Sequence, residues 1–180
     1  MGIPDHTRLI NKGTMKITLP KIKLLFLLKH RNTPWNPDEQ YASELSSGLL
    51  NSVRFITRML EKSFSSCQPY LEQVVDGNGI NCVVTRVCPQ VVVIEALWVT
   101  PEKLSELCQI HPDVKWIIRL HSEVPFLANE GIAMDWLNRY TQINDRVMIA
   151  ANSPRAAREL SQLLHHNVLH LPNCYEIENS

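Results

Sequence analysis

Residues 116–126 read WIIRLHSEVPF, and they join the pattern of a strand to a sudden run of polar side chains. The first half is almost entirely apolar, as expected for a strand whose two faces are both covered by helices. Alternation along the strand places Arg119 and His121 on the same face. The strand therefore ends in polar groups, and the rest of the chain indicates where in a fold those groups would lie.

Short apolar runs of strand type recur along the chain and alternate with stretches of helical period. This alternation predicts a parallel sheet wrapped by helices. Six strands are expected, at residues 21–28, 70–75, 90–96, 114–120, 146–151 and 167–171. Five helices are expected, at residues 48–62, 80–87, 101–110, 132–140 and 154–164. Thr100 and Ser153 each precede a proline, which is typical of the residue before a helix start.

Six strands joined by right-handed crossovers give an α/β fold: a doubly wound, Rossmann-like parallel sheet with helices on both faces. In the commonest strand order of such sheets, the first and fourth strands are neighbours, and ligands bind in the crevice at their carboxyl ends. Residues 119–123 end the fourth strand, so we expect them at this crevice. The length of 180 residues predicts one domain at residues 21–175, with a flexible extension at 1–20 and a tail at 176–180.

Composition and charge argue against several classes of partner. The formal net charge is zero, so no global field favours nucleic acid or an anionic membrane. The five cysteines form no CxxC pair, which is typical of free thiols in a reducing compartment. The most apolar run, residues 24–28, is far too short to cross a membrane. We therefore expect a cytoplasmic protein that binds neither nucleic acid nor membrane.

The common cofactor and metal motifs are absent from the sequence. The chain contains no GxGxxG fingerprint and no GxxxxGK[ST] phosphate loop, which removes support for NAD, FAD and P-loop chemistry. The histidines within residues 165–170 gain no fixed common face from a strand that follows a helix end, and no fourth ligand is evident. We therefore expect no cofactor and no metal.

A long polar loop at residues 29–48 follows the first expected strand, and long loops in compact domains are often functional. Arg31 and Asn32 in this loop are candidates to line a substrate site. At the start of the next helix, backbone N–H groups could meet an anion, and the candidate residues there are Gly48, Asn51 and Ser52. A surface loop without a ligand is the alternative interpretation.

The end of the fourth strand supplies the main candidates for chemistry. Arg119 could pair with a phosphate or a carboxylate, and His121 could accept a proton near neutral pH. Ser122 and Glu123 follow them into a loop. In the alternative interpretation, Arg119 pairs with Glu95 or Glu123. His121 would then cap a neighbouring helix.

The third strand ends EALW at residues 95–98, which places a carboxylate in an otherwise apolar run. A buried carboxylate must be paired or neutralised, so Glu95 is a candidate base and also a candidate structural acceptor of hydrogen bonds. We favour the structural role. Trp98, at the end of the same strand, is a candidate for substrate contact.

Four pieces of the chain carry a resemblance to a known family. They are VVVIEALWVTPEKL (91–104), WIIRLHSEVPFLANEGIA (116–133), AANSPRAAREL (150–160) and LPNCYE (171–176). Together they resemble the amino-terminal, Rossmann-like domain of GT-B glycosyltransferases, over about residues 21–175. They are similar in particular to unclassified glycosyltransferase-like proteins of bacteria and their phages.

The resemblance implies roles for several residues. In many such enzymes a histidine at the end of the fourth strand reaches the donor sugar or its phosphate, and His121 matches it. Asn152 and Ser153 resemble the polar pair before the helix that follows the fifth strand. The expected base is His121 or Glu123. The resemblance implies no metal, because this fold stabilises the leaving phosphate with basic side chains and helix ends.

The end of the chain is where the resemblance becomes incomplete. Such enzymes usually read Pro-Asn-Gly where the chain crosses to a second domain that binds the nucleotide half of a sugar donor. Pro172 and Asn173 match this crossing, with Cys174 in place of the glycine, and Asn173 is a candidate substrate-binding residue. The resemblance therefore implies that the donor-binding half is missing, and that a nucleotide sugar would be a co-substrate bound weakly by this half alone.

Three hypotheses of function follow from the sequence. The first is the acceptor half of a GT-B enzyme, of the hexosyltransferase class if active, which needs a partner chain or a homo-oligomer to supply the donor half. The second is a non-catalytic module that binds a nucleotide-like or phosphorylated small molecule. The third is an interaction or oligomerisation protein that uses the face otherwise turned toward a second domain.

Overall fold

The structure, a computed structural model, describes residues 20–30 and 48–175, and these residues form an α/β fold with a parallel sheet. The strands are β1 (Ile22–Lys29), β2 (Cys67–Val74), β3 (Val91–Glu95), β4 (Lys115–Leu120), β5 (Val147–Ala151) and β6 (Val168–His170). The helices are α1 (Gly48–Ser63), α2 (Gly79–Val87), α3 (Pro101–Ile110), α4 (Val124–Asn129), α5 (Ala133–Tyr140) and α6 (Pro154–Leu164). The predicted fold class is confirmed, whereas the predicted extension and tail lie almost entirely outside the described residues.

The strand order is β2-β1-β3-β4-β5-β6, and every neighbouring pair runs parallel. The expectation that the first and fourth strands are neighbours is wrong, because β3 lies between them. The sequence VVVIE of β3 is apolar on both faces and almost fully buried, which suits a central strand. In contrast, β2 contains Pro69 and several polar side chains, which an edge strand accommodates because one of its sides has no strand partner.

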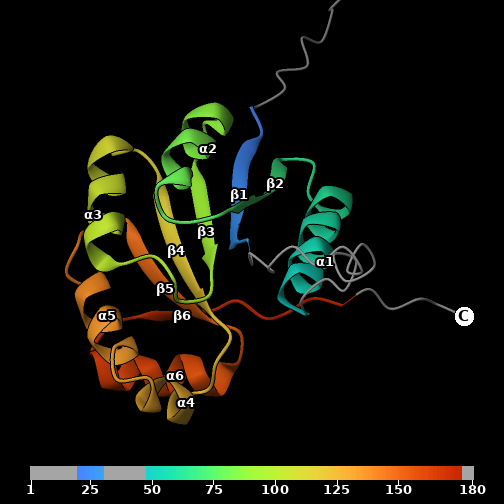
Figure 1. Ribbon diagram of the computed structural model, residues 1–180. Coiled ribbons are helices and arrows are strands. Elements are labelled where there is room, and N and C mark those ends of the chain that lie inside the picture. The colour runs from blue at the N-terminus through green and yellow to red at the C-terminus, as the bar shows by residue number, and fades with distance from the viewer. Residues whose placement is uncertain (1–19, 31–47, 176–180) are drawn as a thin grey trace, which may run out of the picture.

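The helices form two unequal layers on the sheet (Figure 1). Among the described helices, α1 alone covers one face, and α2, α3, α5 and α6 cover the other. This division follows from right-handed crossovers, because the connection from β1 to β2 runs in the opposite direction to all the later ones. Val53 and Ile56 of α1 pack on Phe26 and Val93 in the smaller core, while the larger core fills the other side.

The predicted helix starts are confirmed in atomic detail. The Thr100 hydroxyl oxygen accepts a hydrogen bond from the backbone N–H of Lys103 at 3.2 Å, and that of Ser153 accepts one from Ala156 at 3.0 Å. Both side chains therefore act as N-caps of helices whose first turn contains a proline. The prediction that Ser122 and Glu123 follow the strand into a loop is confirmed, and Glu123, in an extended conformation, is the last residue before the short helix α4, which was not predicted.

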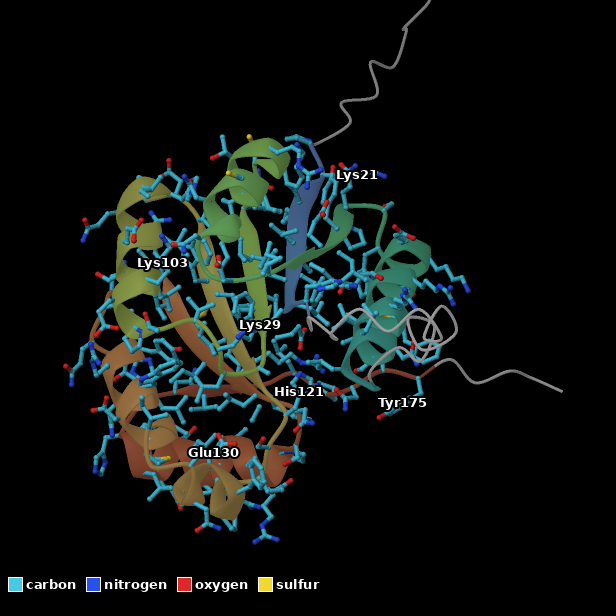
Figure 2. The ribbon with its side chains drawn as sticks, viewed as in Figure 1. Lys21, Lys29, Lys103, His121, Glu130 and Tyr175 are labelled. Atoms are coloured by element: carbon cyan, nitrogen blue, oxygen red, sulfur yellow. The ribbon has the colours of Figure 1, made fainter. Side chains whose placement is uncertain are left out.

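The carboxyl ends of all the strands lie along one edge of the sheet, which we call the carboxyl edge. Lys29 at the end of β1 and His121 after β4 mark this edge in Figure 2. The opposite edge, where the strands begin, is the amino edge. Because α1 and α3 lie on opposite faces, the connections that leave β1 and β3 diverge, and ligands of doubly wound sheets bind at such switch points. No helix within the described part of the chain is long and apolar enough to cross a membrane.

Candidate functional site

A buried ion pair lies at the carboxyl edge, where β3 and β4 end. Glu95 and Arg119 are neighbours in the register of these strands, and each is only 1% exposed. The Arg119 Nη1 atom donates to Glu95 Oε1 at 3.2 Å and to Oε2 at 3.1 Å. The alternative interpretation from sequence, in which Arg119 pairs with Glu95, is therefore the one the structure shows. The structural role favoured for Glu95 is also present.

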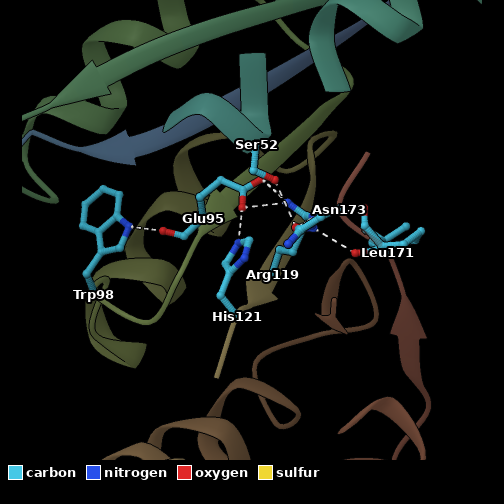
Figure 3. Close-up of polar contacts among 8 residues, drawn as sticks. Ser52, Glu95, Trp98, Arg119, His121, Leu171 and Asn173 are labelled. Carbon is cyan, nitrogen blue, oxygen red and sulfur yellow. Dashed lines mark hydrogen bonds and ion pairs between the residues drawn. The ribbon is translucent and has the colours of Figure 1, made fainter. Parts of the chain in front are cut away.

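His121 joins this pair from the first position after β4 (Figure 3). Its Nε2 atom lies 2.6 Å from Glu95 Oε2, and its side chain is 19% exposed. A carboxylate bonded to arginine acts as an acceptor, so Nε2 must carry the hydrogen in this bond. In the neutral ring, Nδ1 then keeps its lone pair, and among the described residues the hydrogen bond of His121 is the one made by Nε2. The part of the alternative interpretation in which His121 caps a neighbouring helix is not what the structure shows.

Arg119 also holds the segment at residues 171–175, which we call the C-terminal segment. The Nε atom donates to the carbonyl oxygen of Leu171 at 3.0 Å, and Nη2 donates to that of Pro172 at 2.9 Å. Nη2 also donates to Asn173 Oδ1 at 2.7 Å. All three guanidinium nitrogens therefore have partners within the chain. A phosphate or carboxylate ligand could reach Arg119 only by displacing one of them.

Asn173 and Ser52, both predicted as substrate-binding residues, meet each other in this network. The Ser52 hydroxyl donates to Asn173 Oδ1 at 3.0 Å, and Ser52 is 5% exposed. The amide oxygen thus accepts from a helix on one side and from a buried arginine on the other. Gly48 and Asn51 lie on the same first turns of α1. Arg31 and Asn32 lie outside the described residues.

The turn after Glu95 has an unusual backbone. Ala96 has a φ angle of 71°, a left-handed conformation that costs a non-glycine residue about 1–2 kcal/mol. The Ala96 N–H donates to the carbonyl oxygen of Arg119 at 2.9 Å, and the Trp98 indole N–H donates to that of Glu95 at 2.9 Å. These bonds fix the turn beside the ion pair. The indole nitrogen of Trp98 is therefore used within the chain, and the ring is half-buried.

The remaining predicted residues form a second, more exposed group on the same edge. Glu123 accepts a hydrogen bond from the Ser153 hydroxyl at 3.3 Å. The Asn152 N–H donates to the carbonyl oxygen of Leu120 at 3.1 Å, which ties the end of β5 to β4. Ser122 is half-buried between the two groups. The structure thus brings most of the predicted residues to one edge, but only part of them into one bonded network.

Glu95 is the central residue of this network; from the sequence it was a candidate base and a candidate structural acceptor, with the structural role favoured. It accepts from both Arg119 and His121, so it determines the direction in which the imidazole ring lies. The signal for this role was its position as the one charged residue of a buried strand, opposite an arginine on the next strand. A carboxylate that orients a histidine in this way is a common arrangement in acid-base catalysis.

Two hollows formed by described residues lie away from His121. One, of about 350 Å³, is at the amino edge between the ends of α2 and α3, with His111 and Cys88 in its wall. The other, of about 160 Å³, lies between α1 and the C-terminal segment, next to the Phe55 and Tyr175 rings, which are 6.4 Å apart. The ion-pair residues Glu95 and Arg119, and His121 beside them, therefore line neither of these two hollows.

The site defines the protein as a Rossmann-like α/β protein with a carboxylate-oriented histidine at its carboxyl edge. Comparison with protein-family models gave no match, and comparison with curated protein sequences gave none either. Within residues 20–30 and 48–175, no group of three or more histidine, cysteine, aspartate or glutamate side chains could hold a metal ion.

Proposed function

We propose that this chain is the acceptor half of a GT-B type glycosyltransferase in which His121 is the base. The observation that carries the proposal is the hydrogen bond between His121 and Glu95 beside the switch point of the sheet. The carboxylate orients the ring and keeps the hydrogen on Nε2, so Nδ1 is the atom able to accept a proton. The resemblance to GT-B amino-terminal domains supplies the class of reaction.

The proposed step transfers a sugar from a nucleotide sugar to an acceptor hydroxyl. The acceptor O–H proton passes to His121 Nδ1 as the acceptor oxygen bonds to the anomeric carbon. The bond from that carbon to the phosphate oxygen breaks, and the nucleoside diphosphate leaves with the electron pair. Glu95 stabilises the imidazolium that forms, although Arg119 already neutralises part of its charge. His121 is a better candidate than Glu123, whose carboxylate is bonded to Ser153.

The donor half is part of the proposal. The Pro172–Asn173 pair resembles the crossing to a second domain, and a nucleotide sugar would bind between two such halves. The protein alone should therefore show weak turnover, and addition of a partner that carries a nucleotide-binding half should raise it. A binding module built on Arg119 is less well supported, because the guanidinium nitrogens are all bonded within the chain.

The test is the release of nucleoside diphosphate from a panel of nucleotide sugars, with the protein alone and with a candidate partner chain. His121→Gln retains an N–H donor for Glu95 but removes the basic nitrogen. It should lower the rate by about 10²–10⁴-fold. His111→Gln is the matched control, because His111 also bonds a side-chain oxygen but lies at the amino edge. Full activity in His121→Gln, or no release in any mixture, would count against the proposal. Calorimetric binding without turnover would favour the binding module.

A further inference from the structure

The larger of the two hollows lies at the amino edge, where α2 and α3 end, and residues 110–114 form much of its wall. We call it the amino-edge hollow. We infer that it is a binding site for a small amine with an apolar body. The ammonium group of the ligand lies at Asp113, and its hydrocarbon part lies against the apolar wall. The hollow is at the opposite edge of the sheet from His121, so the inference goes beyond the proposed function and does not depend on it.

The size and the apolar wall of the amino-edge hollow suit a small organic molecule. Its volume of about 350 Å³ lies within the range of roughly 300–1,000 Å³ that small-molecule sites occupy. The apolar part of the wall consists of Val84, Pro89, Ile110, Pro112 and Val114. Ile110, the last residue of α3, is 48% exposed although it is a large hydrophobic residue. Contact with a hydrocarbon group would remove part of this surface from water, which favours a ligand with an apolar body.

The hydrogen-bond donors of the same wall are largely used within the chain. Pro89 and Pro112 have no backbone N–H. The N–H groups of Cys88, His111 and Val114 donate to carbonyl oxygens at 2.8, 2.9 and 3.2 Å. The hydroxyl and thiol groups of the wall also donate to oxygen atoms of the chain. A ligand that supplies hydrogen-bond donors therefore fits this wall better than one that supplies acceptors.

The wall offers two side-chain acceptors to such a ligand. His111 Nε2 lies 2.8 Å from Oδ1 of Asn81, which also accepts from the Thr85 hydroxyl, so Nε2 carries the hydrogen and Nδ1 keeps its lone pair. Asp113 adds an exposed carboxylate. Among the described residues, the side-chain donor that bonds Asp113 is Arg146, and it bonds the carbonyl oxygen at 3.1 Å. The Asp113 carboxylate is therefore available to a cation.

The ends of α2 and α3 add to the preference for a cation. The carboxyl end of a helix carries a partial negative charge and carbonyl oxygens without a partner in the helix. The chain itself supplies an example of an ammonium group in this position. Lys23 Nζ donates to the carbonyl oxygen of Val87, the last residue of α2, at 3.0 Å. A primary amine with an apolar body thus satisfies the charge, the acceptors and the apolar wall together.

The test is an NMR titration of the ¹⁵N-labelled protein with three probes of similar shape: benzylamine, benzyl alcohol and benzoate. They carry a positive charge, no charge and a negative charge at neutral pH. We expect benzylamine to bind with a dissociation constant of about 1–10 mM, as for other small fragments. Benzyl alcohol should bind at least about threefold more weakly, and benzoate more weakly still. The amide shift changes should be largest at His111, Asp113 and Val114.

Two variants and one control separate charge from shape. Asp113→Asn keeps the size of the side chain and should weaken benzylamine binding by about two- to fivefold, with benzyl alcohol unaffected. Asp145→Asn, an exposed carboxylate at the same edge but outside the wall, is the control and should change neither. Thr85→Trp, at an exposed position of α2, should fill the hollow and weaken all three probes. Urea unfolding of this variant shows whether it is folded.

Three outcomes would overturn the inference. They are equal affinity for the three probes, amide shift changes that map away from residues 84–89 and 110–114, and unchanged benzylamine affinity in Asp113→Asn. Absence of any shift change with benzylamine would overturn it as well. None of these measurements involves nucleotide-sugar turnover, so failure of the amine site is distinguishable from failure of the proposed function.

Discussion

Two histidines lie at opposite edges of the same sheet, and each hydrogen-bonds a side-chain oxygen. At the carboxyl edge, His121 Nε2 lies 2.6 Å from the Glu95 carboxylate. At the amino edge, His111 Nε2 lies 2.8 Å from Oδ1 of Asn81. The two bonds are similar in length, but their acceptors differ in charge. Glu95 is an anion held by Arg119, whereas Asn81 is a neutral amide.

The electrostatic surroundings of the two rings explain why only one of them is a candidate for chemistry. Burial lowers the pKa of His111 below its ordinary value of 6.5, because loss of water disfavours the charged form of the ring. The Trp116 ring beside it, with centroids 6.5 Å apart, adds apolar surface. A histidine with a hydrogen-bonded partner is therefore not enough to identify a site. Whether such a histidine is a candidate for chemistry depends on the charge of its partner and on the charges next to that partner.

The largest expected effect tests whether the carboxyl edge depends on its charge pair. Arg119→Met leaves Glu95 buried without a cation and leaves the carbonyl oxygens of the C-terminal segment without a donor. We expect the free energy of unfolding to fall by about 3–5 kcal/mol, measured by urea denaturation. Arg155→Met, which breaks an exposed pair with Glu159 on α6, is the control and should have little effect. Near-equal stability of the two variants would contradict the structural importance of Arg119.

A smaller effect concerns how helices begin at the carboxyl edge. Ser153→Ala removes the N-cap of α6 and the bond to Glu123. We expect a loss of about 1 kcal/mol in the free energy of unfolding. Ser153→Asn, which retains a capping oxygen, should keep most of the stability. If alanine and asparagine gave the same result, the cap would not be the cause.

The end of α2 at the amino edge depends on a left-handed backbone conformation. Cys88, after α2, has a φ angle of 52°, and its N–H donates to the carbonyl oxygen of Val84 at 2.8 Å. Glycine fits this conformation better, so Cys88→Gly should raise the free energy of unfolding by about 0.5–1 kcal/mol. Ala96→Gly tests the same strain at the carboxyl edge and should give a gain of similar size. Thermal and urea unfolding of both variants would show whether either one is destabilised, which would contradict this expectation.

The smallest effect is a dependence of stability on pH that comes from the amino edge. Because the pKa of His111 is lowered in the folded state, the unfolded chain binds a proton first as the pH falls. This contribution to stability is present above pH 6.5, is lost as the pH falls below it, and is gone once His111 is protonated in the native state. His111→Gln should make the decline between pH 7 and pH 5 shallower. An unchanged decline in urea titrations at several pH values would assign the effect to other groups.

The sequence was sufficient for the parts of the fold that depend on local pattern. The Thr-Pro pair predicted the start of α3 and the Ser-Pro pair the start of α6, because a cap and a proline act within one helical turn. Apolar runs predicted every strand to within a few residues. The start of β2 at Cys67, three residues before the predicted one, was missed because Pro69 is unusual inside a strand. The helix α4 was missed because six residues are too few to show a helical period.

The features of the fold and of the site that could not be predicted from the sequence depend on contacts between residues far apart in the chain. The position of β3 between β1 and β4 depends on how the strands compete for the centre of the sheet, which no single strand reveals. The bond from Ser52 to Asn173 joins residues 121 positions apart. Alternation along β4 did place Arg119 and His121 on one face. It could not show that the nitrogens of Arg119 would be divided between Glu95 and the C-terminal segment.

The unequal helix layers have a consequence for how the molecule opens in solution. The helix α1 packs on the smaller of the two cores. The backbone amides of α1 should therefore exchange with deuterium sooner than those of α2, α3, α5 and α6 on the other face. Ser52 belongs to this less protected layer, whereas Glu95 and Arg119 belong to the central strands. Brief local opening of α1 would therefore disconnect one anchor of the network while the rest of the molecule remains folded.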